Sequence, residues 1–185
     1  MLEVVPVSLG AALAKKGPET LMTLLLDTSE PDPIDMIEEV ARARDLDAQR
    51  VDATEVHLCL TGSWRDISMW FSWQEEAQVL QVGAPLEIKV PAARKDEVLR
   101  LLALINERLW LGHFDLWKSG GEIVYRHGAV LADGQQLAPG QAEILLRGAM
   151  EAFERFYPTF NYVVWAGKTA EEAMTASILE PVGTA

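Results

Sequence analysis

His57 and Cys59 are the two side chains of this sequence that come closest to a nucleophile and its base. A cysteine nucleophile needs a base within hydrogen-bond reach, and a third group must orient that base. The two residues are two positions apart in a segment that reads as a strand, so they share a face with Cα atoms about 7 Å apart. No orienting group is evident, and an inert buried cysteine is the more common role. We therefore expect no catalysis at this pair.

The histidines do not form a metal-binding pattern. A zinc site uses three or four converging ligands, whereas His57, His113 and His127 are widely spaced and no HxH, HExxH or CxxC spacing occurs. His113 and His127 fall on consecutive predicted strands and could approach each other, but two ligands are too few. Phosphate-binding glycine loops and the GxSxG pattern are also absent from the sequence. We predict a protein that is not an enzyme and has no metal or cofactor.

Composition and charge restrict the possible partners. The chain has 185 residues, 49% of them hydrophobic, and a formal net charge of −12. This charge argues against nucleic acid and anionic membranes as partners, because both attract basic surfaces. A single cysteine allows no internal disulfide, and no apolar run approaches the length of a membrane span, so we expect a soluble cytoplasmic protein.

The first half of the sequence predicts a helix followed by three strands. Residues 1–30 read as an N-terminal arm, in which 19–26 could form a short helix or strand, and a helix begins at Pro33 with Asp32 as its N-cap. Apolar alternation then predicts three strands that form an antiparallel meander. They cover 55–60, 66–73 and 80–89. Pro85 cannot donate to a strand ladder, so the third strand is expected at an edge or bulged there.

The second half predicts a long helix, a hairpin and further helices. Pro91 opens a helix of about 20 residues that ends at Gly112. Strands at 114–118 and 122–130 are joined by a Gly-rich turn, and Pro139 opens a helix that Pro158 ends or kinks. Thr169 and Glu172 form a capping box for a last short helix. The sequence thus predicts a single α+β domain over 31–180, with a tail at 181–185. Its five-stranded antiparallel sheet carries helices on one face, in the order α-β-β-β-α-β-β-α.

Several residues of the long helix and the strands are not explained by this core. Leu104 and Leu111 fall on the helix face expected to be polar, and Trp70 points away from the core-facing Trp73. The polar patch from Asn106 to Arg108 either is solvated, organises the hinge at Gly112 and His113, or contacts a partner. The candidate interaction surface therefore consists of Trp70, Leu104, Asn106, Glu107, Arg108, Leu111 and His113.

Two segments resemble a known family. The stretch VPAARKDEVLRLLALINERLWLGHFDLW, followed by ERFYPTFNYVVWAGKTAEEAM, is similar to the YbjN family of bacterial proteins, described as sensory transduction regulators. The resemblance covers about residues 33–180 and leaves 1–30 outside. It implies the type III secretion chaperone-like fold, whose members are acidic homodimers that bind extended segments of client proteins along the sheet and helix surface. It implies no catalytic residues.

These observations lead to two functional hypotheses. The first is a non-enzymatic cytoplasmic regulatory or chaperone-like protein that forms a homodimer and recognises a segment of an unidentified partner protein. The second is a small-molecule sensor, with a ligand held by tryptophans between sheet and helices. The sequence has six, Trp64, Trp70, Trp73, Trp110, Trp117 and Trp165.

Overall fold

The computed structural model describes residues 32–179. The predictions made for the arm at 1–30, for the element at 19–26 and for the tail at 181–185 lie outside these residues.

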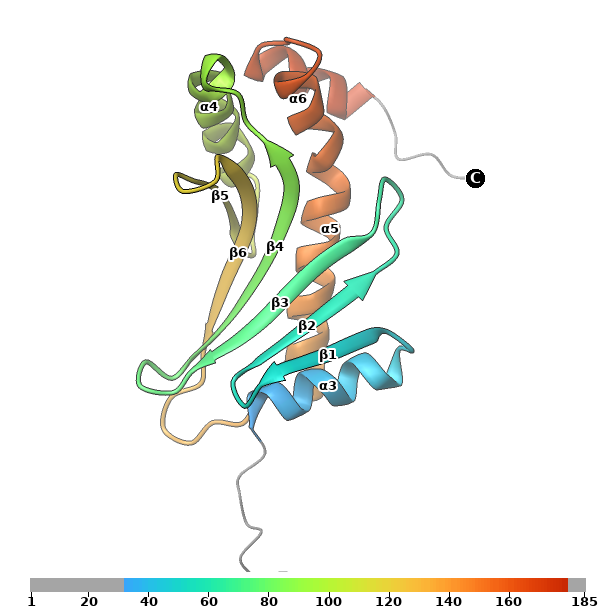
Figure 1. Ribbon diagram of the computed structural model, residues 1–185, viewed down its shortest axis with the longest axis vertical. Coiled ribbons are helices and arrows are strands. Elements are labelled where there is room, and N and C mark those ends of the chain that lie inside the picture. The colour runs from blue at the N-terminus through green and yellow to red at the C-terminus, as the bar shows by residue number, and fades with distance from the viewer. Residues whose placement is uncertain (1–31, 180–185) are drawn as a thin grey trace, which may run out of the picture. The chain divides into compact units, whose positions relative to one another are not determined.

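The described residues form one antiparallel sheet of six strands (Figure 1). In space the strands run β1-β2-β3-β4-β6-β5, so β1 and β5 are the two edges. The predicted α+β class and the meander are confirmed, but the sheet has six strands rather than five. The strands are β1 (Asp47–Asp52), β2 (Glu55–Leu60), β3 (Ile67–Gln74), β4 (Val79–Lys89), β5 (His113–Trp117) and β6 (Glu122–Val130).

The strand that the sequence did not predict is β1. All of its residues are exposed, so it has no apolar alternation that could reveal it. It pairs with β2, and the Arg50 guanidinium joins it to the preceding helix through Asp35 and Glu38, at 2.5 and 2.9 Å. This strand has no buried face, so it is held by backbone pairing and by charge.

The proline in β4 marks a bulge and not an edge. β4 lies between β3 and β6, and its register with β6 shifts between Pro85 and Lys89. Within this interval Glu87 has φ 55°. Four steps along β4 here match two along β6, and such a bulge lets a central strand accommodate a residue that lacks an N–H donor.

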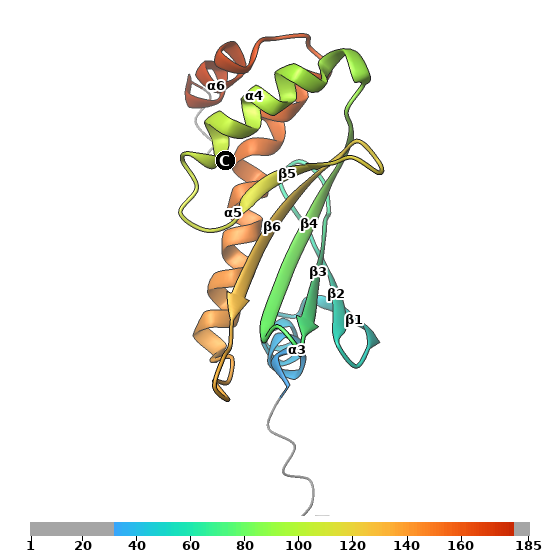
Figure 2. The same ribbon diagram turned by 90° about the vertical axis from the view of Figure 1, so that its left-hand side faces the viewer.

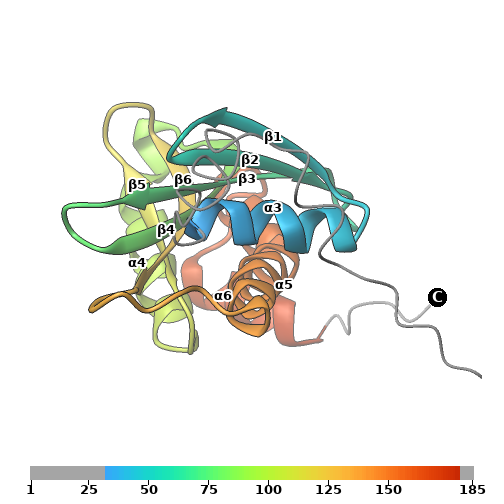
Figure 3. The same cartoon turned by 90° about the horizontal axis from the view of Figure 1, so that it is seen from below.

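The four α-helices of residues 32–179 lie on one face of the sheet, as predicted. Figures 2 and 3 show them on the same side, with the opposite face of the sheet free of helices among the described residues. The long helix α5 spans the sheet and supplies most of the helical core. The helical elements are α3 (Pro33–Ala43), the 3₁₀ turn η1 (Ala92–Arg94), α4 (Lys95–Asn106), α5 (Pro139–Val164) and α6 (Ala170–Leu179).

The helix α4 is shorter than the sequence predicted, because it ends at Asn106 and not at Gly112. The Asn106 carboxamide accepts a hydrogen bond from the Phe114 N–H at 2.8 Å and donates one to the Phe114 carbonyl at 3.0 Å. This pair of bonds makes the chain reverse direction. Leu109 and Leu111, which continue the apolar pattern, lie in the connection to β5 instead of in the helix.

The helix α5 continues through Pro158, where the sequence predicted an end or a kink. Proline supplies no N–H to the carbonyl four residues earlier, which belongs to Glu154. The Trp64 indole N–H donates to this carbonyl at 3.0 Å, and the Glu154 carboxylate accepts from the Ser63 N–H at 2.6 Å. The β2–β3 loop thus satisfies the helix where the proline interrupts it.

The predicted capping box at the start of α6 is confirmed. The Thr169 N–H donates to the Glu172 carboxylate at 2.9 Å, and the Glu172 N–H donates to the Thr169 hydroxyl at 3.2 Å. The Ala170 N–H in turn donates to Glu97 of α4 at 2.7 Å. These bonds hold α6 beside α4, so α4 is covered on more than one side.

Candidate functional site

The face of the sheet opposite the helices is the candidate functional site, and we call it the open face. The strand register places one residue from each strand in a row that crosses the whole open face. Along a strand every second side chain points to the same face, so neighbouring rows contain the residues two positions away. From β1 to β5 the row is Gln49, His57, Trp70, Gly83, Arg126 and His113.

Trp70 lies at the centre of this row, on the face that the sequence predicted for it. Its half-buried indole covers Gly83 of β4, where a Cβ atom would fall 2.2 Å from the Trp70 Cζ2 atom. Pro85 and Val124 are paired in the next row, and the strand alternation places both on the open face. Val124 is buried although it is not part of the main core. Trp70, Pro85 and Val124 therefore give the open face an apolar centre.

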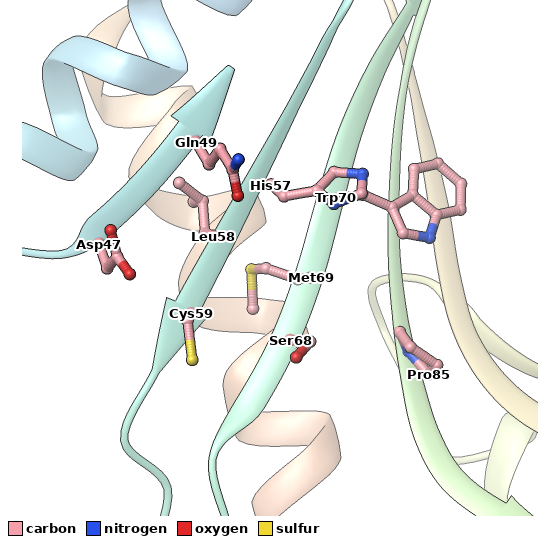
Figure 4. A pocket seen from close by; sticks show the side chains of 9 residues that line it. All are labelled: Asp47, Gln49, His57, Leu58, Cys59, Ser68, Met69, Trp70 and Pro85. Carbon is pink, nitrogen blue, oxygen red and sulfur yellow. The ribbon is translucent and has the colours of Figure 1, made fainter. Parts of the chain in front are cut away.

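A shallow pocket of about 230 Å³ lies beside this centre, over β1 to β4. Figure 4 shows the His57 ring pointing toward Trp70, with Cys59 and Ser68 farther along their strands. The lining residues are Asp47, Gln49, His57, Leu58, Cys59, Ser68, Met69, Trp70 and Pro85. Of these nine residues, only Trp70 belongs to the candidate interaction surface that the sequence predicted.

Charged groups stand at the two ends of the row. On the β5 side, the Asp115 carboxylate contacts both Arg126, at 3.2 Å, and His113, at 3.3 Å. On the β2 side, His57 Nε2 lies 2.6 Å from the Glu55 carboxylate. The open face thus combines an apolar centre with hydrogen-bonding groups of both charges at its periphery.

The structure supplies the orienting partner for His57 that the sequence did not reveal, but no nucleophile. Glu55 occupies the orienting position, whereas Cys59 has no hydrogen bond to His57. Cys59 is also exposed, which corrects the expectation of a buried thiol. Cys59 is the last residue of β2 whose side chain lies on the open face, and it lines the pocket there. The geometry does not assemble the relay that a cysteine nucleophile needs.

The histidines of β5 and β6 lie on opposite faces of the sheet. His127 pairs with the buried Val82 and so faces the helices, while His113 belongs to the open-face row. Burial, and secondarily the nearby His113, lower the pKa of His127. Across residues 32–179, no three His, Cys, Asp or Glu side chains converge in a way that could hold a metal ion.

The residues predicted around the hinge divide into structural and exposed groups. Asn106 organises the hinge through its bonds to Phe114, which is the second of the roles considered for the polar patch. Glu107 and Arg108 are exposed. Leu104 is half-buried and packs against the core, which corrects its expected position on a polar face. The reason is that α6 and α5 both pack on α4, so its apolar surface is wider than one stripe.

Leu111 and Gly112 are explained by contacts within the chain. A Cβ atom at Gly148 of α5 would fall 2.6 Å from a Leu111 methyl carbon, so Leu111 packs against that helix. Gly112 has φ 71°, and a Cβ there would lie 2.3 Å from the Tyr125 hydroxyl. That hydroxyl donates to the Leu111 carbonyl at 3.0 Å, and burial raises the pKa of Tyr125 to about 12. The hinge is therefore built for packing.

The tryptophans do not gather around a cavity between sheet and helices. Trp110 is fully exposed and Trp165 is 66% exposed, while Trp64 binds α5. A wider cleft of about 660 Å³ lies between α5 and the connection from α3 to β1, but no tryptophan lines it. The arrangement predicted for a small-molecule sensor is thus not present in the described residues.

Comparison with known proteins is consistent with the fold just described. A chain in the crystal structure of the ExsC-ExsE complex has 17% sequence identity and a TM-score of 0.50, and the match covers 71% of this chain and 92% of that one. The fold is type III secretion chaperone-like, as the sequence resemblance implied. No curated protein matches the chain. None of the helices in the described part is long and apolar enough to cross a membrane.

A sequence model of the YbjN family, described as "Putative bacterial sensory transduction regulator", matches residues 33–161. This range contains the six strands and most of α5, including every residue of the open-face row. The chain belongs to the YbjN family.

Proposed function

We propose that this protein is a non-enzymatic regulatory protein that binds an extended segment of a partner protein on its open face. The observation that carries the proposal is the face of the sheet that no described helix covers, with Trp70, Pro85 and Val124 at its centre. An apolar centre with a polar rim is the usual anatomy of a protein interface. We place the protein in the cytoplasm, in line with its single cysteine.

The structural neighbour supports the class of ligand. A solved structure that shares this fold is a complex of two proteins, ExsC and ExsE. The family description, sensory transduction regulator, likewise fits a protein that acts by binding another protein.

The chemistry of the open face indicates what the segment must contain. An aromatic or long aliphatic side chain would lie against Trp70 and fill the pocket of about 230 Å³ beside it. Polar groups on either side would reach Asp115 and Arg126 at one end and His57 at the other. Large aromatic residues in partly desolvated positions carry a disproportionate share of binding energy, so Trp70 should dominate.

The test is selection of random peptides of about twelve residues on the full-length protein, with Trp70→Ala and Trp165→Ala compared in parallel. Trp165 is 66% exposed just beyond α5, so its removal controls for the loss of an indole elsewhere. We expect the wild type and Trp165→Ala to enrich the same peptides, and Trp70→Ala to bind them about tenfold or more weakly. Enrichment of the same peptides by Trp70→Ala with unchanged affinity would refute the open face as the binding site.

We also propose that the protein is a homodimer that buries an apolar patch beside α5. Trp110 is fully exposed, its neighbour Leu111 packs at Gly148, and Ile144, one turn earlier on α5, is 50% exposed. Exposed large apolar side chains that lie together indicate an interaction surface. Light scattering at micromolar concentration should give twice the chain mass, and Trp110→Ser with Ile144→Ser should give the single mass. A monomeric wild type would refute the dimer without affecting the open face.

A further inference from the structure

Lysines are few in the described part of the chain. Residues 32–179 contain four, and Lys168 lies over the Tyr162 ring. The other three, Lys89, Lys95 and Lys118, form no ion pair within the same residues. They lie at the end of β4, at the start of α4 and in the β5–β6 turn. Most arginines of this acidic protein do contact a carboxylate, a carbonyl or a ring, so these unpaired ammonium groups stand out.

Two of these lysines border a small pocket at the tip of the β5–β6 hairpin. Figure 2 shows this tip beside the connection from β4 to α4. Lys95 and Lys118 both line the pocket, and Trp117, which is 38% exposed, forms part of its wall. The remaining lining is apolar or small, with Val90, Ala92, Leu116 and Gly121. The pocket is thus apolar inside and positively charged at its rim.

The acidic groups near the pocket leave the two rim lysines unpaired. Glu122 lies opposite Lys89 and Trp117 in the strand register. Asp96 follows Lys95 in the first turn of α4. Neither forms an ion pair with Lys95 or Lys118 in the structure. The rim therefore offers two positive charges to a ligand.

The edge of β5 offers one backbone position beside this pocket. Phe114 directs its N–H and carbonyl away from β6, because both are bound by Asn106. Residues two apart on a strand direct these groups the same way, so those of Leu116 also point away from β6. Asn106 therefore closes the first half of the edge, while no described residue binds the outward backbone groups of Leu116 next to the pocket.

The volume of the pocket identifies the size of its ligand. It measures about 200 Å³, below the roughly 300 to 1,000 Å³ of sites that enclose a free small molecule. One apolar side chain fits such a volume, while the flanking groups of the same segment remain at the rim. The pocket therefore suits one residue of a polypeptide and not a whole metabolite.

We propose that this pocket binds a short extended protein segment in which an apolar residue is flanked by aspartate or glutamate. The apolar side chain enters between Leu116 and Trp117, the backbone pairs with Leu116, and the carboxylates reach Lys95 and Lys118. The segment belongs to a partner that is neutral or basic overall, because the net charge of −12 repels a strongly acidic protein. The inference rests on the proposed function for its class of partner, but it concerns a different surface.

The experiment uses the full-length protein and fluorescein-labelled peptides in anisotropy titrations. The probe is Gly-Asp-Leu-Asp-Gly, and the matched peptide carries Asn in place of both Asp residues. We expect the acidic peptide to bind about tenfold more tightly than its Asn counterpart. Lys95→Ala and Lys118→Ala should each weaken its binding about three- to tenfold, and the double variant should remove the preference.

The control is Arg42→Ala, which removes one positive charge from the last turn of α3. It changes the net charge equally, so affinity within about twofold of wild type separates a local contact from a general field effect. Trp70→Ala should leave this peptide bound, which distinguishes the pocket from the open face. Equal binding of both peptides, an equal loss in Arg42→Ala, or a double variant that changes only the oligomeric state would overturn the proposal.

Discussion

The sheet ends in β1 on one side and in β5 on the other, and the two edge strands are anchored in different ways. The side chains of β1 are all exposed, and the strand is tied to α3 by Arg50, Asp35 and Glu38. By contrast, β5 buries Phe114, whose ring makes edge contacts with Tyr125, Phe156 and Phe160 at 5.2 to 6.1 Å.

The backbone of β5 is also held more firmly than that of β1. Asn106 binds both polar groups of Phe114, and Tyr125 binds the carbonyl of Leu111 just before the strand. Contacts of this kind are shielded from water and little affected by salt, whereas exposed ion pairs are weak and screened. One edge is therefore specified by packing and the other by charge. Substitutions at β5 should have the larger effects.

The largest effect is expected from Gly112→Ala. A Cβ at Gly112 would lie 2.3 Å from the Tyr125 hydroxyl, and the φ of 71° is already unfavourable for alanine. We expect a loss of about 3 kcal/mol in the free energy of unfolding, from strain together with overpacking. Urea titration measures it.

The matched control for that substitution is Gly134→Ala. Gly134 has a similar φ of 73°, but no atom lies within 4 Å of the position that a Cβ would take there. It should lose only about 1 kcal/mol, from backbone strain alone. Equal losses in the two variants would mean that the contact with Tyr125 does not hold β5.

Asn106→Ala should come next, with a loss of about 2 kcal/mol. It leaves the N–H and carbonyl of Phe114 without their partner, and each unpaired group carries a desolvation penalty. Asn106→Asp tests the pair of bonds more specifically. Its carboxylate can still accept from the Phe114 N–H, but it cannot donate to the Phe114 carbonyl, so two acceptors face each other. Chemical denaturation should rank wild type above both variants. An Asp variant as stable as wild type would contradict the paired geometry.

Tyr125→Phe should lose about 1 kcal/mol at neutral pH, since it removes one hydrogen bond to Leu111. Burial raises the pKa of Tyr125 to about 12 from its usual value of 10. The Tyr125 phenol therefore loses its proton at a lower pH in the unfolded state than in the folded state. Its contribution to the free energy of unfolding is complete below about pH 10 and declines as the pH rises toward 12. Unfolding measured from pH 8 upward should therefore show a smaller alkaline decline in the Phe variant. Parallel curves would refute the buried phenol.

Much of the packed part of the fold follows from apolar alternation. The periodicity that predicted β2, β3 and β4 is the one that places Leu58, Met69 and Val82 in the core. Apolar spacing likewise indicated α5, because a helix with a buried stripe repeats every three to four residues. β1 has no buried face, so no such pattern could reveal it.

The end of α4 and the composition of the open face depend on contacts between distant residues. Asn106 ends the helix through Phe114, eight positions away, although Leu109 and Leu111 continue the apolar spacing. The open-face row depends on β6 pairing with β4, a non-local choice that brings Arg126 into line with Trp70. Strand alternation identified Trp70 by itself, but it could not identify its neighbours across the sheet.

The smallest effect is expected from Arg50→Met, which keeps an apolar stem but removes the charge that joins β1 to α3. The Arg50 guanidinium contacts Asp35 and Glu38 at a partly exposed site, so the expected loss is about 0.5 to 1 kcal/mol. Most of this loss should disappear between about 0.05 M and about 1 M salt, because screening shortens the range of the interaction. Asn106→Ala, measured in the same two buffers, should keep its full effect. If both losses were equally insensitive to salt, packing and not charge would hold the β1 edge as well, and the contrast between the two edges would fail.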